Sequence, residues 1–375
     1  MHRLQFHYTL SRTSSPALVR NPLIDLLQAV STHGSISAGA RALGLSYRHV
    51  WGELKRWENE LGSELLVWEK GQSAKLSKFG AKLMWAERQA QARLAPQIES
   101  LRGDLERAFA VAFDPHAHVV TLYASHDDAL AALREHALHP DPAVADGTQL
   151  HLDIRFCGSV DAIRALNEGR CVMAGFHTLQ HPAPGSLAER TYKPLLKPGL
   201  HKIIGFAQRT QGLMVAAGNP LGLRTLTDVQ RTQARFVNRA LGTGTRVVLD
   251  ELLAQAGIAA DTVQGYERNE PSHTAAAHAV ASGAADVAIG ITIAAQAQGL
   301  EFVPLVQENY HLVCLKSALD EPAVVALRAV LQGALWQQTL AGIAGYVPSH
   351  SGNVLSLRER LPWWNFSMRK TIARP

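Results

Sequence analysis

The segment from Gly34 to Leu66 constrains the fold of this chain most strongly, because a short helical pattern is followed by a glycine and a longer helical pattern. Ser35 can cap the short helix, and Gly44 supplies the permissive backbone that a tight turn requires. Ser46 can cap the longer helix. Its apolar residues recur every three or four positions, at Tyr47, Val50, Leu54, Trp57 and Leu61. The segment therefore predicts a helix-turn-helix with one buried stripe on its second helix.

The rest of the second helix is polar, and its hydrogen-bond donors are concentrated in the first turns. In a DNA-binding helix-turn-helix, these turns meet base edges and phosphates in the major groove. The alternative is an αα-hairpin in an all-helical core, with its basic side chains merely solvated. The candidate DNA-binding residues here and in the following strand are Ser35, Ser46, Tyr47, Arg48, His49, Gly52, Lys55, Arg56 and Lys75.

Two short β-prone runs, LLVWEK and AKLSKF, flank the polar turn Gly71–Gln72–Ser73 and predict the wing of a winged helix. Asn21 and Pro22 predict the start of a first helix, LIDLLQAVSTH. With GSISAGARALGLSYRHVW, LG and the basic wing ending in LSKFG, residues 21–85 resemble the N-terminal domain of ModE-type molybdate-responsive repressors, which are related to LysR-type regulators. The wing, Lys70 to Lys78, departs from the family in being short, with one glycine. The resemblance implies that the partner is double-stranded DNA, and a dimer would require a pseudo-palindromic operator.

Charge is distributed unevenly along the 375 residues, a length that fits two or three domains. Residues 1–110 contain 15 Lys and Arg against 10 Asp and Glu, whereas residues 111–375 contain 22 of each, so the net charge of +5 lies with the helix-turn-helix. This is typical of a DNA-binding module joined to a domain that does not bind DNA. The 47% of hydrophobic residues argues against disorder.

Cysteine usage favours a reducing cytoplasm, because Cys157, Cys171 and Cys314 are odd in number, widely spaced and set in apolar runs. The first 20 residues lack the apolar core of a signal peptide, and no window has the roughly 18 apolar residues that a membrane span needs. The histidines have no metal-binding spacing such as HExxH. We therefore expect a cytoplasmic protein with no membrane segment, no metal site and no cofactor.

A long helical pattern runs from Phe79 to Ala110, interrupted by Pro96. Its apolar stripe consists of Phe79, Leu83, Ala90, Leu94, Ile98, Leu101 and Leu105. So narrow a stripe favours another helix as its partner, and it predicts a homodimer or higher homo-oligomer, with a kink near Pro96. The alternative is a helix that lies across its own domain.

Strands and helices alternate from Val119 onward, which predicts an α/β domain with a largely parallel sheet. The strand-like runs are VVTLYAS, LHLDIRFC, CVMAGFH, GLMVAAG, RFVNR, TVQGYER and DVAIG. Crossings near residues 203–207 and 301–310 predict two lobes with a cleft between them. Through ASHD, CGSVDAIRALNEGRCVMAGFH, NRALGTGTR, SHTAAAHAVASGAADVAIG and GLEFVPLVQENYHL, residues 117–346 resemble the periplasmic-binding-protein-like domain found joined to winged helices or to molybdenum-cofactor biosynthesis domains.

Several loops of this domain place a hydroxyl or a glycine at a predicted helix start, where free N–H groups favour an anion. The alternative interpretation of any one of these loops is an ordinary helix N-cap with no ligand. The candidate ligand-binding residues are Ser125, His126, Gly158, Ser159, Thr243, Gly244, Thr245, Arg246, Ser272 and Tyr310. Arg246 is expected to be the one formal charge near the ligand, and His177 and His278 are open as lining or structural residues. No GxSxG motif is present, and we expect no enzyme activity.

These observations favour a transcription regulator whose effector domain senses a small anion. The two resemblances imply molybdate or tungstate. The alternatives are the pterin of the molybdenum cofactor or another small anion, and a solute-binding or cofactor-binding protein that does not bind DNA. The predicted division is a flexible arm (1–20), a winged helix-turn-helix domain (21–78), a linker or dimerisation helix (79–112), a two-lobed α/β effector domain (117–346) and a C-terminal tail (347–375).

Overall fold

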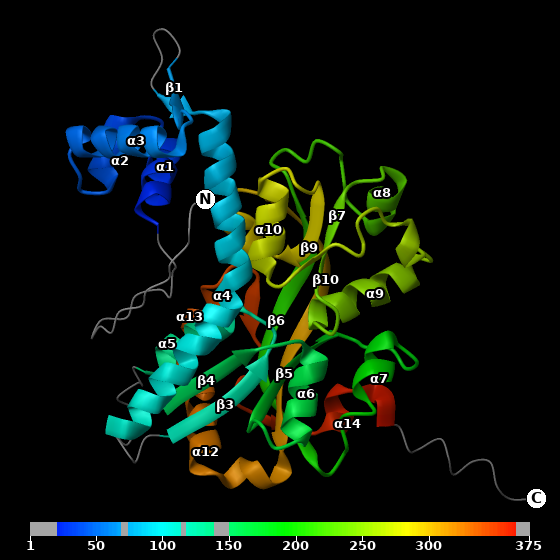
Figure 1. Ribbon diagram of the computed structural model, residues 1–375. Coiled ribbons are helices and arrows are strands. Elements are labelled where there is room, and N and C mark those ends of the chain that lie inside the picture. The colour runs from blue at the N-terminus through cyan, green and yellow to red at the C-terminus, as the bar shows by residue number, and fades with distance from the viewer. Residues whose placement is uncertain (1–20, 69–73, 114–117, 139–149, 365–375) are drawn as a thin grey trace, which may run out of the picture. The chain divides into compact units, whose positions relative to one another are not determined.

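A computed structural model describes residues 21–68, 74–113, 118–138 and 150–364. The chain forms two compact units that divide between Ala95 and Pro96, and each unit is described by itself (Figure 1). The expected arm at residues 1–20, the wing turn at Gly71–Gln72–Ser73 and residues 365–375 lie outside the described residues.

The N-terminal unit is a winged helix-turn-helix. Its elements are α1 (Pro22–His33), α2 (Ile36–Ala42), α3 (Tyr47–Leu61), β1 (Leu66–Val67), β2 (Lys75–Leu76) and the first part of α4 (Lys78–Phe113). β1 and β2 pair antiparallel, with Leu66 opposite Leu76. The expected caps are present: the side chains of Asn21, Ser35 and Ser46 each accept a backbone N–H in the first turn of their helices.

The core of this unit lies between α1, α3 and the start of β1. Its most buried side chains include Leu27, Val30, Val50, Leu54 and Leu65. Full burial of such a side chain stabilises a fold by about 1.5–3 kcal/mol, so this core is what fixes the angle between the two helices of the motif.

α4 continues without interruption through Pro96, and its C-terminal part belongs to the second unit. Ion pairs fasten that part to α5 (Asp128–Ala137) and β4 (Leu150–Phe156). They join Glu99 to Arg134, Arg102 to Glu135, Asp104 to Arg155, and Arg107 to Asp153. Of the expected apolar stripe, Leu83 is half-buried against the first core, whereas Leu94, Leu101 and Leu105 are exposed.

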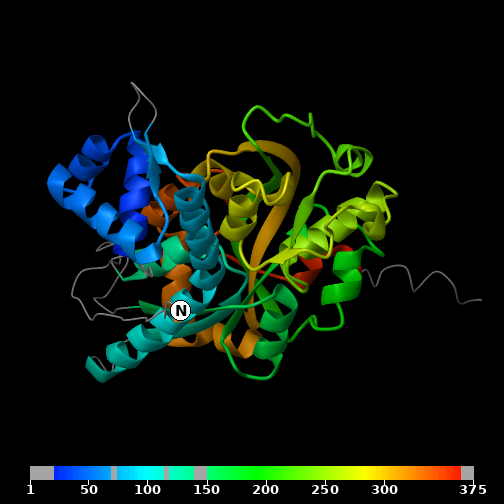
Figure 2. The ribbon, with the colours of Figure 1, turned by 45° about the horizontal axis from the view of Figure 1, so that its top comes forward.

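The second unit is built on one curled, mixed sheet (Figures 1 and 2). Its strand order is β4-β3-β5-β10-β6-β9-β7-β8. Its other strands are β3 (His118–Ala124), β5 (Met173–Leu179), β6 (His201–Val215), β7 (Phe236–Arg239), β8 (Asn269–Glu270), β9 (Val287–Ile291), β10 (Glu301–Leu315), β11 (Tyr346–Pro348) and β12 (Val354–Leu355). The two long strands β6 and β10 pair antiparallel from Glu301 opposite Val215 to Leu315 opposite His201, and they cross between the lobes. The expectation of a largely parallel sheet is corrected by these crossings.

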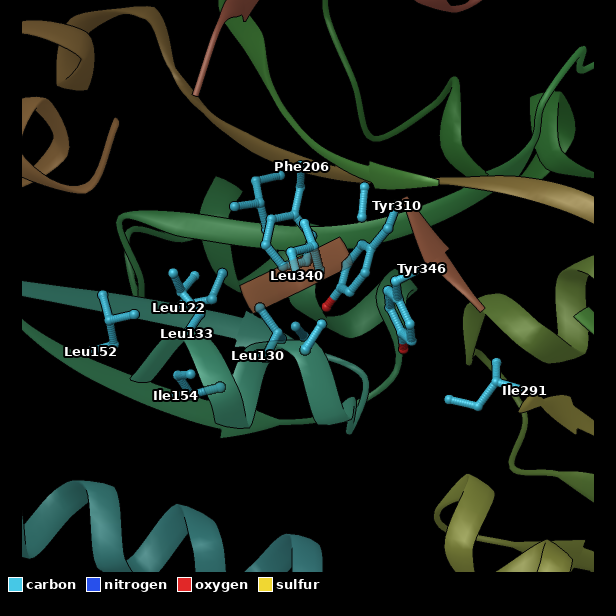
Figure 3. Close-up of a cluster of buried hydrophobic side chains, with 14 of the residues drawn as sticks. Leu122, Leu130, Leu133, Leu152, Ile154, Phe206, Ile291, Tyr310, Leu340 and Tyr346 are labelled. Carbon is cyan, nitrogen blue, oxygen red and sulfur yellow. The ribbon is translucent and has the colours of Figure 1, made fainter. Parts of the chain in front are cut away.

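Helices cover the faces of this sheet. They are α5, α6 (Ser159–Asn167), α7 (Leu187–Tyr192), α8 (Leu226–Arg231), α9 (Gly244–Gln255), α10 (His273–Ala281), α11 (Thr292–Ala297), α12 (Pro322–Gln332), α13 (Ala334–Ala341) and α14 (Leu357–Arg360). The largest core joins leucines of β3, β4 and α5 to Phe206, Tyr310 and Tyr346 (Figure 3). No helix among the described residues is long and apolar enough to cross a bilayer.

Three sequence-based expectations about this unit are wrong. GLMVAAG is the end of β6 rather than a separate strand. TVQGYER forms turns rather than a strand. Gly265 within it has φ of +88°, and a Cβ there would lie 2.3 Å from the carbonyl oxygen of Phe236, so this position requires glycine. The segment after residue 346 is not a tail, since β11 and β12 pair with β6 and Trp363 packs into a core cluster beside Phe176.

Candidate DNA-binding surface and ligand site

The exposed face of α3 begins at its N-cap, Ser46, and carries Arg48, His49 and Gly52. Tyr47 is 51% exposed, so the prediction that places it on the buried stripe is wrong: the first turn of α3 extends beyond the core. Trp51 is also exposed, at 43%, and sequence reasoning missed it. Periodicity alone could not have found it, because Trp51 is four residues after Tyr47 and three before Leu54, both of which the sequence places on the buried stripe.

One predicted DNA contact, Lys55, is engaged within the domain. The Lys55 ammonium lies 2.6 Å from a carboxylate oxygen of Glu58 and 5.1 Å from the ring centroid of Trp68. Burial opposes ionisation of Glu58, but Lys55 and the N–H groups of Leu65 and Leu66 outweigh it, so the pKa of Glu58 lies below its ordinary value. Lys55 therefore ties the helix to the base of the wing.

The other predicted contacts differ in their surroundings. Arg56 pairs with Glu53 at 2.6 Å on the exposed surface, where such a pair is weak and can be exchanged for a phosphate. The Ser35 hydroxyl caps α2, and Lys75 is exposed on β2. Arg48 and His49 are thus the basic side chains that α3 presents most directly.

In the second unit, loops from both lobes converge. The hydroxyl oxygens of Ser125, after β3, and Ser159, after β4, are 3.5 Å apart. A Cβ on Gly158 would lie 2.8 Å from the carbonyl oxygen of Gly242, which follows β7 in the other lobe. The backbone N–H of Val160 donates to that same oxygen at 3.3 Å. Glycine at position 158 therefore permits the close approach of the two lobes.

A second contact between the lobes involves the start of α9. A Cβ on Gly244 would lie 2.5 Å from Nδ1 of His177, on β5. The Thr245 hydroxyl oxygen accepts from Nε2 of Gln211 at 2.9 Å and lies 3.4 Å from Nε2 of His273. The ring of His177 in turn lies 4.0 Å from the ring of Tyr310. Buried polar groups of both lobes therefore meet around the crossing strands.

Arg209 and Arg239 are among the largest fully buried side chains of the described residues, and their hydrogen bonding differs. Arg209, on β6, forms ion pairs with Asp127 and Glu308 and donates to the Tyr346 hydroxyl at 3.1 Å. The Tyr346 hydroxyl donates to Asp127 at 2.6 Å. The charge of Arg209 is therefore fully compensated within the protein.

Arg239, at the end of β7, is the second of these two arginines. Its Nη2 donates to the carbonyl oxygen of Pro271 at 3.0 Å, but its Nε and Nη1 have no hydrogen-bond partner among the described residues. Burial, and after it the positive charge of Arg209, lowers the pKa of Arg239 to about 9, although Asp127, Asp128 and Glu270 act in the opposite direction. A buried guanidinium with two unused N–H donors has the chemistry to hydrogen-bond an anion.

Further buried polar atoms in this region lack a hydrogen-bond partner among the described residues. They are both ring nitrogens of His177, Nδ1 of His273, the Tyr310 hydroxyl, Oε1 of Gln211 and Oε2 of Glu308. An unsatisfied buried polar group costs about 1–3 kcal/mol. So many in one place indicate a polar ligand site rather than a core.

Burial, reinforced by the charges of nearby arginines, lowers the pKa of the histidines of the candidate site. Burial, followed by the charge of Arg239, lowers the pKa of His126 to about 4 and that of His273 well below its ordinary value. For His177, burial and then Arg209 have the same effect on the pKa. These imidazoles are therefore neutral at pH 7 and can donate or accept one hydrogen bond each without adding charge.

Three predicted ligand residues have local roles. Arg246, expected to be the one formal charge near the ligand, pairs with Asp250 at 3.2 Å and lies 4.0 Å over the ring of Tyr266. Thr243 caps α9 and donates to the carbonyl oxygen of Ala240. Ser272 caps α10. Their roles as N-caps explain why Thr243 and Ser272 carry hydroxyls without invoking a ligand.

Sequence reasoning missed Arg239, Arg209, Gln211 and Glu308. The available signal was a charged or amide side chain inside an apolar strand. In RFVNR, for example, Arg239 ends a strand whose residues are all buried. His278, which was left open, has a structural partner: its Nδ1 lies 3.4 Å from Oε1 of Gln298, the residue that follows α11.

Comparison with known families gives two matches. Residues 143–332, about half of the chain, match the family described as PBP superfamily domain. Residues 23–81 match the family described as bacterial regulatory helix-turn-helix protein, lysR family.

Two curated proteins, both uncharacterized, are similar in sequence. YvgK of Bacillus subtilis (strain 168) is 31% identical over 201 residues, which are 54% of this chain and 64% of that protein. The chain therefore covers less than two thirds of the length of YvgK. A protein in the ferredoxin 2Fe-2S gene 5' region of Clostridium pasteurianum is 33% identical over 111 residues, which are 29% of this chain and 98% of that protein.

Solved structures show weaker likenesses. A hydrogen-peroxide-bound mutant of Corynebacterium glutamicum OxyR has 13% identity and a TM-score of 0.41, covering 86% of this chain and 95% of that one. CbnR, a LysR family transcriptional regulator, has 17% identity and a TM-score of 0.36, covering 80% and 95%.

Proposed function

Because this chain belongs to the PBP superfamily and begins with a helix-turn-helix of the lysR family, we propose that it is a DNA-binding transcription regulator whose second unit senses a small anion. The observation that supports an anionic ligand is Arg239, a fully buried guanidinium with two N–H groups that have no partner among the described residues. A regulator of this kind acts in the cytoplasm, where its operator is.

Molybdate and tungstate are the anions to test first, on the strength of the sequence resemblances to molybdenum-related families. Both are tetrahedral and offer only acceptor oxygens, which suit Arg239 and the hydroxyls of Ser125 and Ser159. Charge compensation by the ligand would relieve the cost of burying Arg239.

One observation favours the pterin of the molybdenum cofactor as the second candidate. Oε1 of Gln211 and Oε2 of Glu308 are buried acceptors without a partner among the described residues. A bare oxyanion has no hydrogen to donate to them, whereas a pterin ring carries N–H donors as well as acceptors. Thermal melting separates the two ligands: if neither molybdate nor tungstate at millimolar concentration raises the melting temperature, the pterin is the next ligand to test.

α5 connects the ligand site to the linker helix. At its N-terminus, Asp127 caps the helix through the backbone N–H of Ala129 at 2.9 Å and also binds Arg209. Toward its C-terminus, Arg134 and its neighbour Glu135 pair with two residues on the C-terminal part of α4. A ligand that moves the start of α5 would therefore displace α4, the helix that leads from the DNA-binding unit.

We propose that the exposed leucines of α4, Leu94, Leu101 and Leu105, form the seam of a homodimer. Large apolar side chains at one side of a long helix are expensive to leave in water. A dimer would also place two recognition helices on successive half-sites of a pseudo-palindromic operator.

The proposal is tested by two measurements on the full chain. Millimolar molybdate or tungstate should raise the melting temperature, with a gain of about 2.7 kcal/mol at a ligand concentration of 100 times Kd. Duplexes selected by the protein from random-sequence DNA should bind more tightly than unselected DNA at the same salt. Ligand binding without any DNA preference would favour a solute-binding or cofactor-binding protein.

A further inference from the structure

Gly52 lies at the centre of the exposed face of α3. Helical residues are spaced by about 100° around the axis, so Gly52 is turned about 160–200° away from Val50 and Leu54, which are buried in the core. Arg48 is one turn before it on the same face, and Asn59, also exposed, is two turns after it. Gly52 therefore lies opposite the core, in the middle of a long helix.

Nothing in the fold of the N-terminal unit requires glycine at this position. A Cβ on Gly52 would meet no described atom within 4 Å, and its φ lies in the ordinary helical range. Glycine in a helix interior costs about 1 kcal/mol relative to alanine. The sequence therefore keeps a destabilising residue where alanine would fit without strain.

The other helical glycines of the same unit have packing reasons. A Cβ on Gly39 would lie 3.0 Å from the backbone of Ala29 and Val30, so this glycine lets α1 and α2 approach each other. A Cβ on Gly80 would lie 2.4 Å from the carbonyl oxygen of Leu65. Gly52 differs from both, because a Cβ at this position would point into open space on the exposed face of α3.

We propose that Gly52 is a DNA-contact position, where the missing side chain lets the backbone of α3 approach the base edges of the major groove. This proposal rests on the DNA-binding function proposed above and deepens it. A helix that enters the groove is separated from the bases by its own side chains. A gap at the centre of the face lets α3 enter deeper, so that Arg48 and the exposed Trp51 can reach base edges that a full-sized side chain at position 52 would hold away.

The test separates helix stability from operator recognition. Gly52→Ala should raise the melting temperature of the full chain, because alanine favours the helix, and yet lower its affinity for a duplex selected by the wild-type protein from random-sequence DNA. Gly52→Gln should lower that affinity at least about tenfold, the size of one lost base contact. Binding to unselected DNA should stay within about twofold of wild type, since phosphate contacts do not need the deeper position.

Gly103→Ala is the matched control. It makes the same substitution inside α4, where the added Cβ meets atoms at an ordinary 3.7 Å, and operator affinity should not change. Wild-type affinity of Gly52→Gln for the selected duplex would overturn the proposal, as would an equal loss on selected and unselected DNA. If the wild-type protein itself shows no preference for any selected duplex, DNA recognition fails and the role of Gly52 falls with it.

Discussion

Replacing Arg239 by methionine should make the ligand-free protein more stable and insensitive to the anion. Burial lowers the pKa of Arg239 to about 9. At about 1.4 kcal/mol per pKa unit, its distance from the ordinary value of arginine corresponds to a cost of about 5 kcal/mol for keeping the charge buried. The folded-state pKa is depressed, so this cost is fully present below about pH 9 and decreases as the pH rises above it.

Local rearrangement and hydration reduce this figure in solution. Replacing buried charges by apolar side chains of similar volume stabilises proteins by about 1–4 kcal/mol, and we expect a gain in that range for Arg239→Met. The gain is measured by urea unfolding of the full chain at pH 7, followed by thermal melting with and without millimolar molybdate or tungstate. The wild-type protein should gain stability with the anion, and Arg239→Met should not.

Arg209→Met provides the matched control, because Arg209 is equally buried but is paired with Asp127 and Glu308. Its removal leaves two buried carboxylates without their cation and should destabilise the protein by about 3–5 kcal/mol. If Arg239→Met destabilises the protein by a similar amount, then Arg239 is already compensated within the fold, and the anion argument is refuted.

Three further substitutions test other parts of the account. Arg48→Ala should weaken binding to a selected duplex by about 1–3 kcal/mol at matched salt without changing the melting temperature, and unchanged affinity would remove Arg48 from the groove. Charging the α4 seam with Leu94→Glu and Leu101→Glu should turn dimers into monomers in analytical ultracentrifugation, because a charge is expensive to bury there, and a variant that stays dimeric places the interface elsewhere. Ser159→Ala and Thr245→Val should each reduce the anion-induced melting shift while leaving DNA affinity of the ligand-free protein intact, and a full shift in both would exclude these hydroxyls from the site.

The helix-turn-helix could be predicted from sequence because local interactions determine its boundaries. Asn21, Ser35 and Ser46 cap the helices through their own side chains, and Gly44 has φ of +67° in the turn. Tyr47 was misplaced because periodicity alone does not say where a helix extends past its core. Local signals therefore give element boundaries more reliably than they give burial.

The candidate ligand site could be proposed from sequence only in part. Ser125, Ser159 and Thr245 were proposed because each follows a strand, in a loop that leads into a helix or in the first turn of that helix. Arg239 was missed because its burial depends on two lobes that meet only in the folded chain. The engagement of Arg246 by Asp250 was available from sequence, since the two residues are four apart on one helix, and it should have counted against Arg246 as a free cation.

The most direct test of the account is the effect of the anion on DNA binding. Fluorescence anisotropy measures the affinity of the full chain for a wild-type-selected duplex at fixed salt, with and without molybdate or tungstate. We predict that the anion changes the operator affinity of the wild-type protein, and that Arg239→Met binds the same duplex without responding. An identical anion response in Arg239→Met, or no preference of the wild-type protein for the selected duplex over random DNA, would contradict the claim that this chain is an anion-sensing DNA-binding regulator.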